Sequence, residues 1–498
     1  MNYCDDLIKN ALKFGNKRLA YDIETGQGIT YKNFLLGVKS LAAGLRARGV
    51  GPGDSVAIHL YNSTDAAMVH MAVQYIGACS CWIDALVQPD ALEFYVDITK
   101  CRLLATHLDL SRVKPVVGMK VDLLSTVDIE IMKKKDAAGA PETPYSFEPN
   151  DVCYIYFTSG TTNRPKGVML TGENHRCFTE ICDTFWRPVS SDSKHISYVP
   201  FSHGFGTIFL LPLTIRTGSE LYIMRAFHPL RVVSAIEQFG ITHIYGVPSH
   251  YQQLLRYPDP KNTLRNLEMA FCAAAKLEHE LMLSWADATD TILCEGYGLI
   301  ETCCGVVWRV GTPSLGTGHM GPLPDRELVE IDILDKHFRP VERGERGQIA
   351  VRGRSVMKGY LENSKETDLA IKNGWFLTGD EGYISSDNQL FMTGRIKDII
   401  NIAGIKVSPY EVESVLLEHP DVAEVAVVAV PDPLYGEVVK AYVRPEPGIE
   451  PVERALIQFA SSHLINFQVP KHIEFIDKFP LNHMGKLDRK ALRELNPV

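Results

Sequence analysis

The sequence predicts an α/β protein with a large N-terminal domain, built from parallel-sheet subdomains with flanking helices, and a small C-terminal α+β domain. A chain of 498 residues is too long for one ordinary hydrophobic core. Short apolar runs rich in Val, Ile and aromatic residues alternate with amphipathic stretches through the first part of the chain, as in a parallel sheet covered by helices. The pattern changes near Gly394, so we expect domains at 1–394 and 395–498.

The N-terminal domain opens with two predicted strands, at 55–60 and 78–83, separated by a predicted helix at 65–76. Residues 132–149 contain three prolines and a run of lysines, 133–135, and predict an exposed connection in which the lysines are solvated. The alternation then resumes, with predicted strands at 152–157, 196–199, 219–223 and 242–245.

The C-terminal domain begins with a predicted helix that runs from Ser408 to Glu418. Ser408 is a favourable N-cap, Pro409 suits the first helical position, and Glu411 completes a predicted capping box. The helix is expected to end before Pro420. The remaining elements are predicted strands at 422–430, 438–443 and 473–476, a loop at 431–437 and a helix at 451–463.

Composition and charge exclude several classes of protein. Apolar residues make up 45% and charged residues 22% of the chain, which is typical of a folded globular protein. The formal net charge of −9 argues against nucleic-acid binding, which needs clustered basic residues. The longest apolar stretches, such as 205–215, are shorter than a membrane span. The eleven cysteines form no Cys-x-x-Cys pair and the first residues do not resemble a signal peptide, so we expect a cytoplasmic protein with reduced thiols.

Residues 158–167, directly after the predicted strand at 152–157, are the most informative segment. Hydroxyl groups that can donate to phosphoryl oxygens come from Thr158, Ser159, Thr161 and Thr162. Close backbone approach and positive charge come from Gly160, Gly167, Arg164 and Lys166. Pro165 excludes a Walker A loop, because that motif continues from its lysine into a helix. We interpret the segment as a phosphate-binding loop; the alternative is a hydroxyl-rich surface turn.

The segment at 156–168 resembles the signature loop of the adenylate-forming superfamily, which includes acyl-CoA synthetases, aryl-CoA ligases, adenylation domains of nonribosomal peptide synthesis and luciferases. Further motifs of this superfamily follow in the expected order, at 200–204, 295–302, 375–380, 394–398 and 482–489. The resemblance covers nearly the whole chain. It implies an ATP-dependent ligase that forms an acyl-adenylate from a small-molecule carboxylic acid, releases pyrophosphate and transfers the acyl group to an acceptor.

The resemblance also implies which residues carry out the first step. Adenylation brings a carboxylate against the α-phosphate of ATP, so cations and hydrogen-bond donors must offset the repulsion. Lys486 matches the lysine that bridges the two anions, and Glu301 matches the ligand of Mg²⁺, which prefers oxygen ligands. Tyr297 is expected to stack on adenine. Asp380 is expected to accept from both ribose hydroxyls, and Arg395 to contact the same sugar. The alternatives are structural roles: a surface lysine, a loop acid, a core tyrosine and a turn aspartate.

The C-terminal domain is expected to be mobile, because Lys397 matches the hinge about which this domain turns in the superfamily. One pose presents the segment of Lys486 for adenylation, and the other presents the opposite face for acyl transfer. Gly404 is expected to line the channel for the second substrate, with a plain turn glycine as the alternative. His203 resembles the residue that gates the acyl pocket, with a core histidine as the alternative.

Two positions depart from the superfamily pattern. Asn163 replaces a glycine, with little expected effect because asparagine tolerates left-handed backbone. Ile300 replaces the threonine that donates to the α-phosphate, so a hydrogen bond worth about 1.5–3 kcal/mol is absent or replaced. Thr302 is the candidate replacement if this segment is extended, since positions two apart share a face of a strand.

The acyl pocket is expected to be apolar and aromatic, by analogy with the superfamily. The residues expected to line it are Phe201, His203, Phe205, Tyr245, Ala273, Ala274 and Cys303. Activators of free amino acids place an aspartate near Ser202 or His203, and the sequence has none at 200–216. A hydrophobic aryl, aliphatic or cyclic acid is therefore expected rather than an α-amino acid.

The sequence does not decide which molecule accepts the acyl group. Coenzyme A is the commonest acceptor of stand-alone members, and we expect it here. A free amine or amino acid, as in amide ligases resembling coronafacate ligase, and the thiol of a carrier protein are the alternatives. A homologue that binds nucleotide but has lost catalysis is a further alternative, supported only by Ile300.

Overall fold

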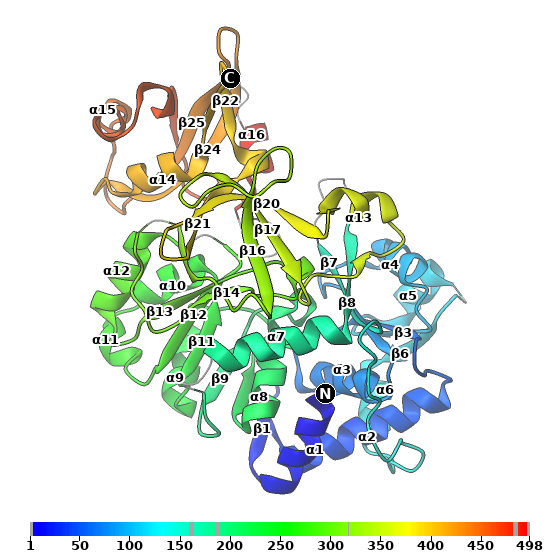
Figure 1. Ribbon diagram of the computed structural model, residues 1–498. Coiled ribbons are helices and arrows are strands. Elements are labelled where there is room, and N and C mark those ends of the chain that lie inside the picture. The colour runs from blue at the N-terminus through cyan, green and yellow to red at the C-terminus, as the bar shows by residue number, and fades with distance from the viewer. Residues whose placement is uncertain are drawn as a thin grey trace.

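The structure is a computed structural model that describes residues 3–118, 120–158, 164–185, 189–275, 277–316, 318–481 and 487–495. The described residues form four sheets: two that are mostly parallel, one antiparallel sheet and a smaller mixed sheet near the C-terminus. In Figure 1 the two mostly parallel sheets make up the lower body of the molecule, and the C-terminal sheet forms a separate unit at the top. The predicted α/β class, with a smaller C-terminal domain, is confirmed.

The first sheet has seven strands in the order β18-β8-β7-β4-β3-β5-β6. Its strands are β3 (Ser55–His59), β4 (Cys79–Trp82), β5 (Leu103–Thr106), β6 (Asp122–Ser125), β7 (Val152–Thr158), β8 (Lys166–Thr171) and β18 (Gly359–Tyr360). Its helices are α3 (Thr64–Tyr75), η1 (Pro89–Ala91), α4 (Leu92–Thr99), α5 (Leu110–Val117) and α6 (Thr126–Met132). Strands β3 to β7 run parallel, whereas β8 returns antiparallel to β7. The predicted phosphate loop therefore connects two neighbouring strands, and its two ends lie side by side.

The second sheet has eight strands in the order β14-β13-β12-β11-β9-β10-β1-β2. Its strands are β1 (Arg18–Asp22), β2 (Gln27–Thr30), β9 (Lys194–Ser197), β10 (Glu220–Ile223), β11 (His243–Gly246), β12 (Met269–Ala273), β13 (Leu293–Tyr297) and β14 (Val307–Arg309). The helices of this part are α1 (Tyr3–Lys13), α2 (Tyr31–Ala47), α7 (Gly172–Phe185), α8 (Leu211–Thr217), α9 (Pro229–Phe239), α10 (Pro248–Leu255), α11 (Pro260–Thr263) and α12 (His279–Ala288). Three short helical turns connect them: η2 (Phe201–His203), η3 (Phe205–Leu210) and η4 (Ile300–Thr302).

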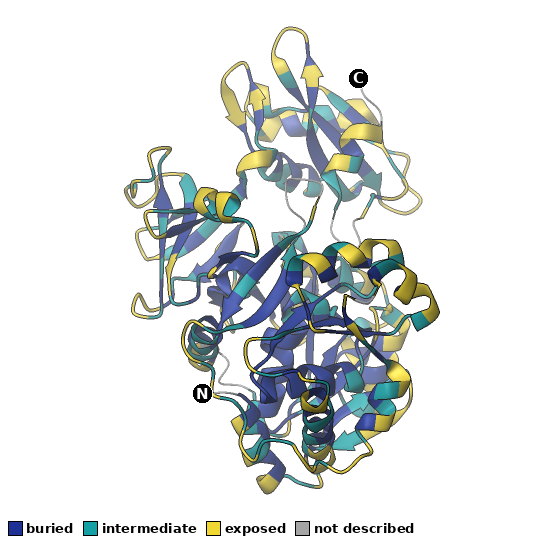
Figure 2. Ribbon diagram, turned by 90° about the vertical axis from the view of Figure 1, so that its right-hand side faces the viewer, coloured by how far each residue is buried: buried dark blue, intermediate teal, exposed yellow. Residues whose placement is uncertain are grey.

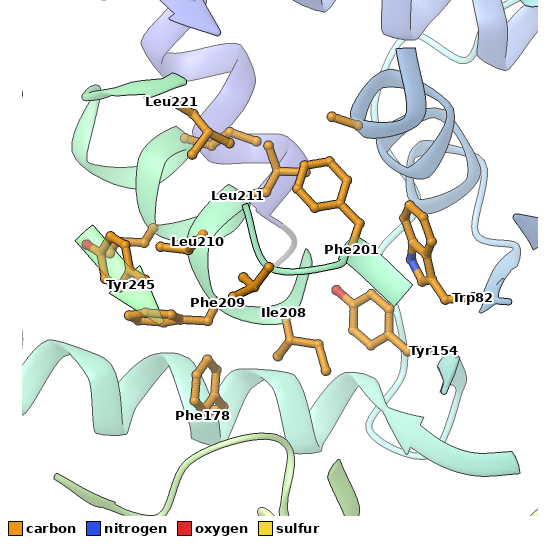
Figure 3. Close-up of a cluster of buried hydrophobic side chains, with 14 of the residues drawn as sticks. Trp82, Tyr154, Phe178, Phe201, Ile208, Phe209, Leu210, Leu211, Leu221 and Tyr245 are labelled. Atoms are coloured by element: carbon orange, nitrogen blue, oxygen red, sulfur yellow. The ribbon is translucent and has the colours of Figure 1, made fainter. Parts of the chain in front are cut away.

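One hydrophobic core joins the two sheets. Trp82 and Tyr154 come from the first sheet and Tyr245 from the second, and all three are buried in the same cluster. Figure 3 shows them around the segment from Phe201 to Leu211, with Phe178 of α7 below. Figure 2 shows that burial follows the strands and that exposed residues lie mainly on the outer helices and loops. The segment that the sequence places beside the acyl group is therefore part of the junction between the sheets.

A third sheet, antiparallel throughout, was not predicted from the sequence. Its strands are β15 (His319–Pro322), β16 (Val329–Leu334), β17 (Gly347–Gly353), β19 (Ile371–Lys372), β20 (Trp375–Ile384) and β21 (Gln389–Arg395), with helix α13 (Ser364–Ala370) beside them. Buried and less buried residues alternate along β20, because one face of this sheet packs on the protein and the other is more open. Asp380 and Arg395 belong to neighbouring strands of this sheet and lie opposite each other.

The C-terminal unit follows a short helical turn, η5 (Ile396–Asp398). It contains β22 (Ile400–Ile402), β23 (Ile405–Val407), β24 (Val422–Asp432), β25 (Gly436–Pro445), β26 (His472–Phe475), α14 (Pro409–Leu417), α15 (Glu453–His463), η6 (Asn466–Gln468) and α16 (Arg489–Leu495). Two hydrophobic clusters on the faces of its sheet consist only of residues after 399. A unit with its own cores supports the proposed boundary near 395, which stays a prediction.

Three sequence predictions need correction. Ser408 precedes α14 as predicted but makes no capping hydrogen bond; its hydroxyl donates instead to the carbonyl of Thr393 at 2.6 Å. Glu411 accepts from Arg346 and is therefore not in a capping box. Lys133 is not simply solvated, because its ammonium pairs with Asp65 at 2.7 Å and with Glu130.

The loop predicted at 431–437 is shorter than expected. Strands β24 and β25 pair from Val422 to Pro445 and leave only a tight turn between Asp432 and Gly436. None of the helices in the described parts of the chain is long and apolar enough to cross a membrane.

Candidate active site

Two side chains meet at the carboxylate of Asp380, which is 1% exposed. The hydroxyl of Tyr297, at the end of β13, donates to Oδ2 of Asp380 at 2.8 Å. The Nε atom of Arg395 lies 3.1 Å from Oδ1. Burial raises the pKa of the Asp380 carboxyl above its ordinary value, and the charge of Arg395 opposes that rise. The cluster joins the second sheet to the third and brings together three residues that the sequence assigned to the nucleotide.

A second buried carboxylate, Glu301, lies in the turn η4 and is 8% exposed. The hydroxyl of Tyr360 donates to its Oε1 atom at 3.0 Å, and its backbone carbonyl accepts from the amide of Met357 at 2.8 Å. Burial raises the pKa of Glu301, whereas the hydrogen bond from Tyr360 lowers it. Glu301 is thus fixed at both its backbone and its side chain.

Lys166, at the start of β8, closes the phosphate loop on its C-terminal side. Its ammonium pairs with Glu366 of α13 and lies 5.2 Å from the centre of the Tyr360 ring. Thr158 pairs with Lys166 across β7 and β8, so both described ends of the loop are held together. The four other loop residues assigned to ATP lie outside the described residues: Ser159, Gly160, Thr161 and Thr162.

Lys486 also lies outside the described residues. Leu481 and Leu487, on either side of its segment, form an antiparallel bridge. The two ends of that segment are therefore adjacent, and α16 follows directly. Lys397 is exposed in η5 between β21 and β22, and its role as the hinge stays a prediction. Gly404 lies in the exposed turn between β22 and β23 with a φ of +93°, and its amide donates to Asn401 at 3.0 Å.

The segment around Ile300 differs from one sequence prediction. It is a helical turn rather than an extended strand, and the hydroxyl of Thr302 accepts from the amide of Leu299 at 3.0 Å. The prediction that Thr302 replaces the missing threonine is therefore wrong, because its hydroxyl is turned back onto its own backbone. The side chain of Ile300 instead fills the space beside Gly204, where an added Cβ would lie 2.9 Å from its Cδ1 atom.

Two of the residues assigned to the acyl pocket, Phe205 and Tyr245, lie with ring centres 6.1 Å apart, and the assigned residues differ in exposure. Phe201, Tyr245 and Cys303 are at most 1% exposed. The hydroxyl of Tyr245 contacts Nδ1 of His195 at 2.8 Å, so its polar end is satisfied within the core. Phe205 is partly exposed and stacks on Phe271, with ring centres 6.0 Å apart. The others, His203, Ala273 and Ala274, are partly or fully exposed. Their role in binding an acid stays a prediction.

Sequence reasoning missed several residues of the site. Asp84, after β4, lies 3.5 Å from the hydroxyl of Ser202, so an acid does approach this segment, from a distant part of the chain. Cys304 was not named, and it shares with the predicted Cys303 a left-handed backbone, with φ values of +78° and +56°, directly after Glu301 and Thr302. Tyr360 and Glu366 gave no local signal, because their partners are far away in the sequence.

Two family models match the chain. The model of the AMP-binding enzyme covers residues 7–361, and that of the AMP-binding enzyme C-terminal domain covers residues 411–486. The chain belongs to the AMP-binding enzyme family. Its resemblance to the adenylate-forming superfamily is thereby confirmed, and the protein is an ATP-dependent, AMP-forming ligase.

Individual members of the AMP-binding enzyme family match over almost the whole chain. A long-chain-fatty-acid–CoA ligase of Bacillus subtilis is 30% identical over 94% of this chain and 90% of that protein. A feruloyl-CoA synthase of an Amycolatopsis species is 30% identical over 94% of each chain. The crystal structure of ATP-bound MatB from Rhodopseudomonas palustris is 26% identical, covers 99% of each chain and has a TM-score of 0.90.

Proposed function

We propose that this ligase joins a hydrophobic carboxylic acid to coenzyme A in two steps. In the first, the carboxylate attacks the α-phosphorus of ATP, forming an acyl-adenylate and releasing pyrophosphate. In the second, the thiol of coenzyme A attacks the acyl carbonyl and AMP leaves. The observation that carries this proposal is the cluster of Tyr297, Asp380 and Arg395, a buried carboxylate between an aromatic ring and a guanidinium. It suits a ribose with an attached purine.

The proposed roles of the nucleotide residues follow from this cluster. The two oxygens of Asp380 would accept from the two ribose hydroxyls, with Arg395 holding the carboxylate ionised. The ring of Tyr297, whose hydroxyl is fixed by Asp380, would present its face to adenine. The loop at 158–162 would hold the phosphates, with Lys166 supporting its stem.

Glu301 is the proposed magnesium ligand. Its carboxylate is a hard oxygen donor held in place by Tyr360, which fits Mg²⁺. Within the described ranges no group of three His, Cys, Asp or Glu side chains could hold a metal by itself, so phosphate oxygens would complete the shell. When bound, Mg²⁺ would reduce the repulsion between the phosphates and the attacking carboxylate.

The C-terminal unit, 395–498, is proposed to turn about Lys397 between the two steps. Its separate hydrophobic clusters support movement as one body. Lys486 would approach the α-phosphate in the first step, and the turn at Gly404 would face the acceptor in the second.

Coenzyme A is proposed as acceptor because the curated relatives named above are, by their names, acyl-CoA-forming enzymes that match this chain almost end to end. The aromatic rings of Phe205 and Phe271 near His203 favour an apolar acid. An amine, an amino acid and a carrier-protein thiol are tested as alternatives.

The experiment measures ATP–pyrophosphate exchange with a panel of cinnamic acids, benzoic acids and fatty acids, and then identifies products by mass after adding coenzyme A or amino acids. We expect exchange with at least one acid and a coenzyme A thioester as product. Asp380→Asn should abolish exchange, whereas Asp387→Asn, in the exposed turn between β20 and β21, should not. An amide product would mean that the acceptor is an amine or amino acid and not coenzyme A. Absence of exchange despite ATP binding would indicate a homologue that has lost catalysis.

A further inference from the structure

The first residue of α16, Arg489, is tied to the interior of the C-terminal unit by several hydrogen bonds. Its guanidinium donates to both carboxylate oxygens of Glu413, at 2.6 and 3.0 Å, and to the carbonyl of Val427 at 2.7 Å. Glu413 is 4% exposed and also accepts from the amide of Val427 at 2.7 Å. A two-point charged contact fixes both the position and the orientation of the guanidinium. The arginine lies three positions after Lys486 in the sequence.

Tyr410, in the first turn of α14, connects this pair to the proposed nucleotide site. The guanidinium of Arg489 lies 5.3 Å from the centre of the Tyr410 ring. On the other side, the ring lies against the backbone of Gly394, where an added Cβ would be 3.2 Å from Cδ2 of Tyr410. The pKa of Tyr410 is raised to about 12, chiefly by burial, although the charges of Arg489 and Arg395 act to lower it. The ring of Tyr410 therefore contacts Arg489 of α16 and the residue next to Arg395, which pairs with Asp380.

A second contact links α16 to the hinge. The guanidinium of Arg493 lies 3.3 Å from Oδ1 of Asp398, in the turn next to Lys397. Helix α16 is thus held at one end by Glu413 and, one turn later, by the hinge itself. A buried ion pair is a costly way to stabilise a domain, because apolar residues of the same volume often do as well. Its position next to the lysine segment suggests another role.

We propose that Arg489, Glu413 and Tyr410 form a positioning unit that fixes the start of α16, which follows the segment of Lys486 in the sequence, relative to the Asp380–Arg395 pair. The unit acts through Lys486 and does not itself touch substrate. It is needed for adenylation, in which Lys486 acts, and not for acyl transfer, in which the opposite face of the domain is used. This inference rests on the proposed function.

The test compares the two half-reactions in Arg489→Lys, which keeps the charge but cannot bind Glu413 at two points. With the acid that gives the fastest exchange in the panel, we expect the rate of ATP–pyrophosphate exchange to fall about 100-fold, because a small displacement of a reacting group has that effect. The KM for ATP and the rate of thioester formation from the supplied acyl-adenylate should stay within about twofold of the wild type.

Two further variants keep the result interpretable. Arg444→Lys is the matched control: it makes the same substitution in another Arg–Glu pair of the C-terminal unit, that of Arg444 on β25 with Glu424 on β24. It should leave both half-reactions unchanged. Tyr410→Leu keeps the Arg489–Glu413 pair and removes the ring that contacts Arg489, and it should also slow exchange selectively.

The outcomes separate this inference from the function on which it rests. Equal loss of both half-reactions in Arg489→Lys, or a loss of exchange no greater than in Arg444→Lys, overturns the positioning unit alone. Normal exchange in Tyr410→Leu overturns the part assigned to the tyrosine. A wild-type enzyme that exchanges with no acid overturns the proposed function, and the inference with it.

Discussion

The hydroxyl of Tyr360 donates a hydrogen bond to Oε1 of Glu301 at 3.0 Å, across 59 residues of sequence. The same ring lies 5.2 Å from the ammonium of Lys166, which closes the phosphate loop. One tyrosine therefore touches both the proposed magnesium ligand and the stem of the loop proposed to hold the phosphates. Its hydrogen bond lowers the pKa of Glu301, which burial raises.

The first prediction concerns Tyr360→Phe. Loss of the donor raises the pKa of Glu301 further, so a larger fraction of the carboxyl is protonated and unable to bind Mg²⁺ at a given pH. The acid limb of the exchange rate should move to higher pH, and the Mg²⁺ concentration for half-maximal rate should rise about tenfold at neutral pH, as expected for a hydrogen bond to a charged group. Exchange measured against pH and Mg²⁺ checks this.

Tyr383→Phe provides the control for that variant. Tyr383 lies on β20 and stacks on Phe391 with ring centres 4.8 Å apart, and its ring is kept by the substitution. It should leave both profiles unchanged. A Tyr360→Phe enzyme with the wild-type acid limb and the wild-type Mg²⁺ dependence would show that Tyr360 has no influence on Glu301.

The second prediction concerns the pair of Lys166 and Glu366, which ties the loop to α13. Glu366→Gln should raise the KM for ATP about fivefold, because the lysine loses the partner that positions the loop. The double variant with Lys166→Met should be no worse than Lys166→Met alone, with a coupling energy of about 1 kcal/mol between the two sites. ATP titrations of exchange in all four proteins give this cycle.

The control is Asp368→Asn, since Asp368 is exposed on the same helix; this variant should leave the KM for ATP unchanged. Additive effects of Glu366→Gln and Lys166→Met on the KM for ATP would mean that the two residues act separately.

Local sequence patterns predicted the parts of the fold that depend on local periodicity. The strands at 55–60 and 152–157 and the helix at 65–76 were confirmed within a few residues, because apolar runs and amphipathic stretches report directly on burial. The antiparallel third sheet was missed. Its strands have no motif of their own apart from the short superfamily motifs at 375–380 and 394–398, and their pairing is set by tertiary contacts.

The candidate site shows the same division. The motifs named Glu301, Tyr297, Asp380 and Arg395, and the structure brings the last three together. No pattern could name Tyr360 as partner of Glu301, since the contact spans two sheets. Local rules also failed where a distant group competed: the hydroxyl of Ser408 bonds the Thr393 carbonyl instead of capping α14. Propensity describes what a side chain can do, and the tertiary fold decides which option is used.

The third prediction concerns stability. Glu295 and Arg309 lie opposite each other on β13 and β14. Oε2 of Glu295 is 3.1 Å from Nη2 of Arg309, and the two side chains are 4% and 1% exposed. Glu295→Leu should lower the free energy of unfolding by about 3 kcal/mol, because it leaves a buried guanidinium without its hydrogen-bond acceptor and counter-ion. Urea unfolding measures the loss. The double variant Glu295→Leu with Arg309→Met removes both groups and should recover most of it; a double variant less stable than Glu295→Leu would contradict this account.

The same pair predicts a pH dependence. Burial raises the pKa of Glu295 from its ordinary 4.5 to about 7, although Arg309 opposes the rise. The folded state then binds this proton more tightly than the unfolded state, so the contribution of Glu295 to stability falls as pH rises from 4.5 to about 7. Over that window the wild type should lose stability relative to the double variant. A constant difference between the two proteins from pH 5 to 8 would mean that Glu295 titrates normally.

The last prediction concerns Ile300, where the superfamily pattern has threonine. The side chain of Ile300 is 8% exposed and packs beside Gly204, and the hydroxyl of Thr302 is bonded to Leu299, so neither residue donates to the α-phosphate. Ile300→Thr would restore the hydroxyl that the superfamily pattern has at this position. Ile300→Val has almost the same shape as Ile300→Thr without the hydroxyl and should cost about 1 kcal/mol of stability for the lost methyl group.

Exchange in Ile300→Thr should be as fast as in the wild type or faster, and faster than in Ile300→Val, because only the hydroxyl separates the two variants. A large loss in Ile300→Thr that Ile300→Val does not share would mean that this enzyme has adapted its adenylation site to an apolar residue here.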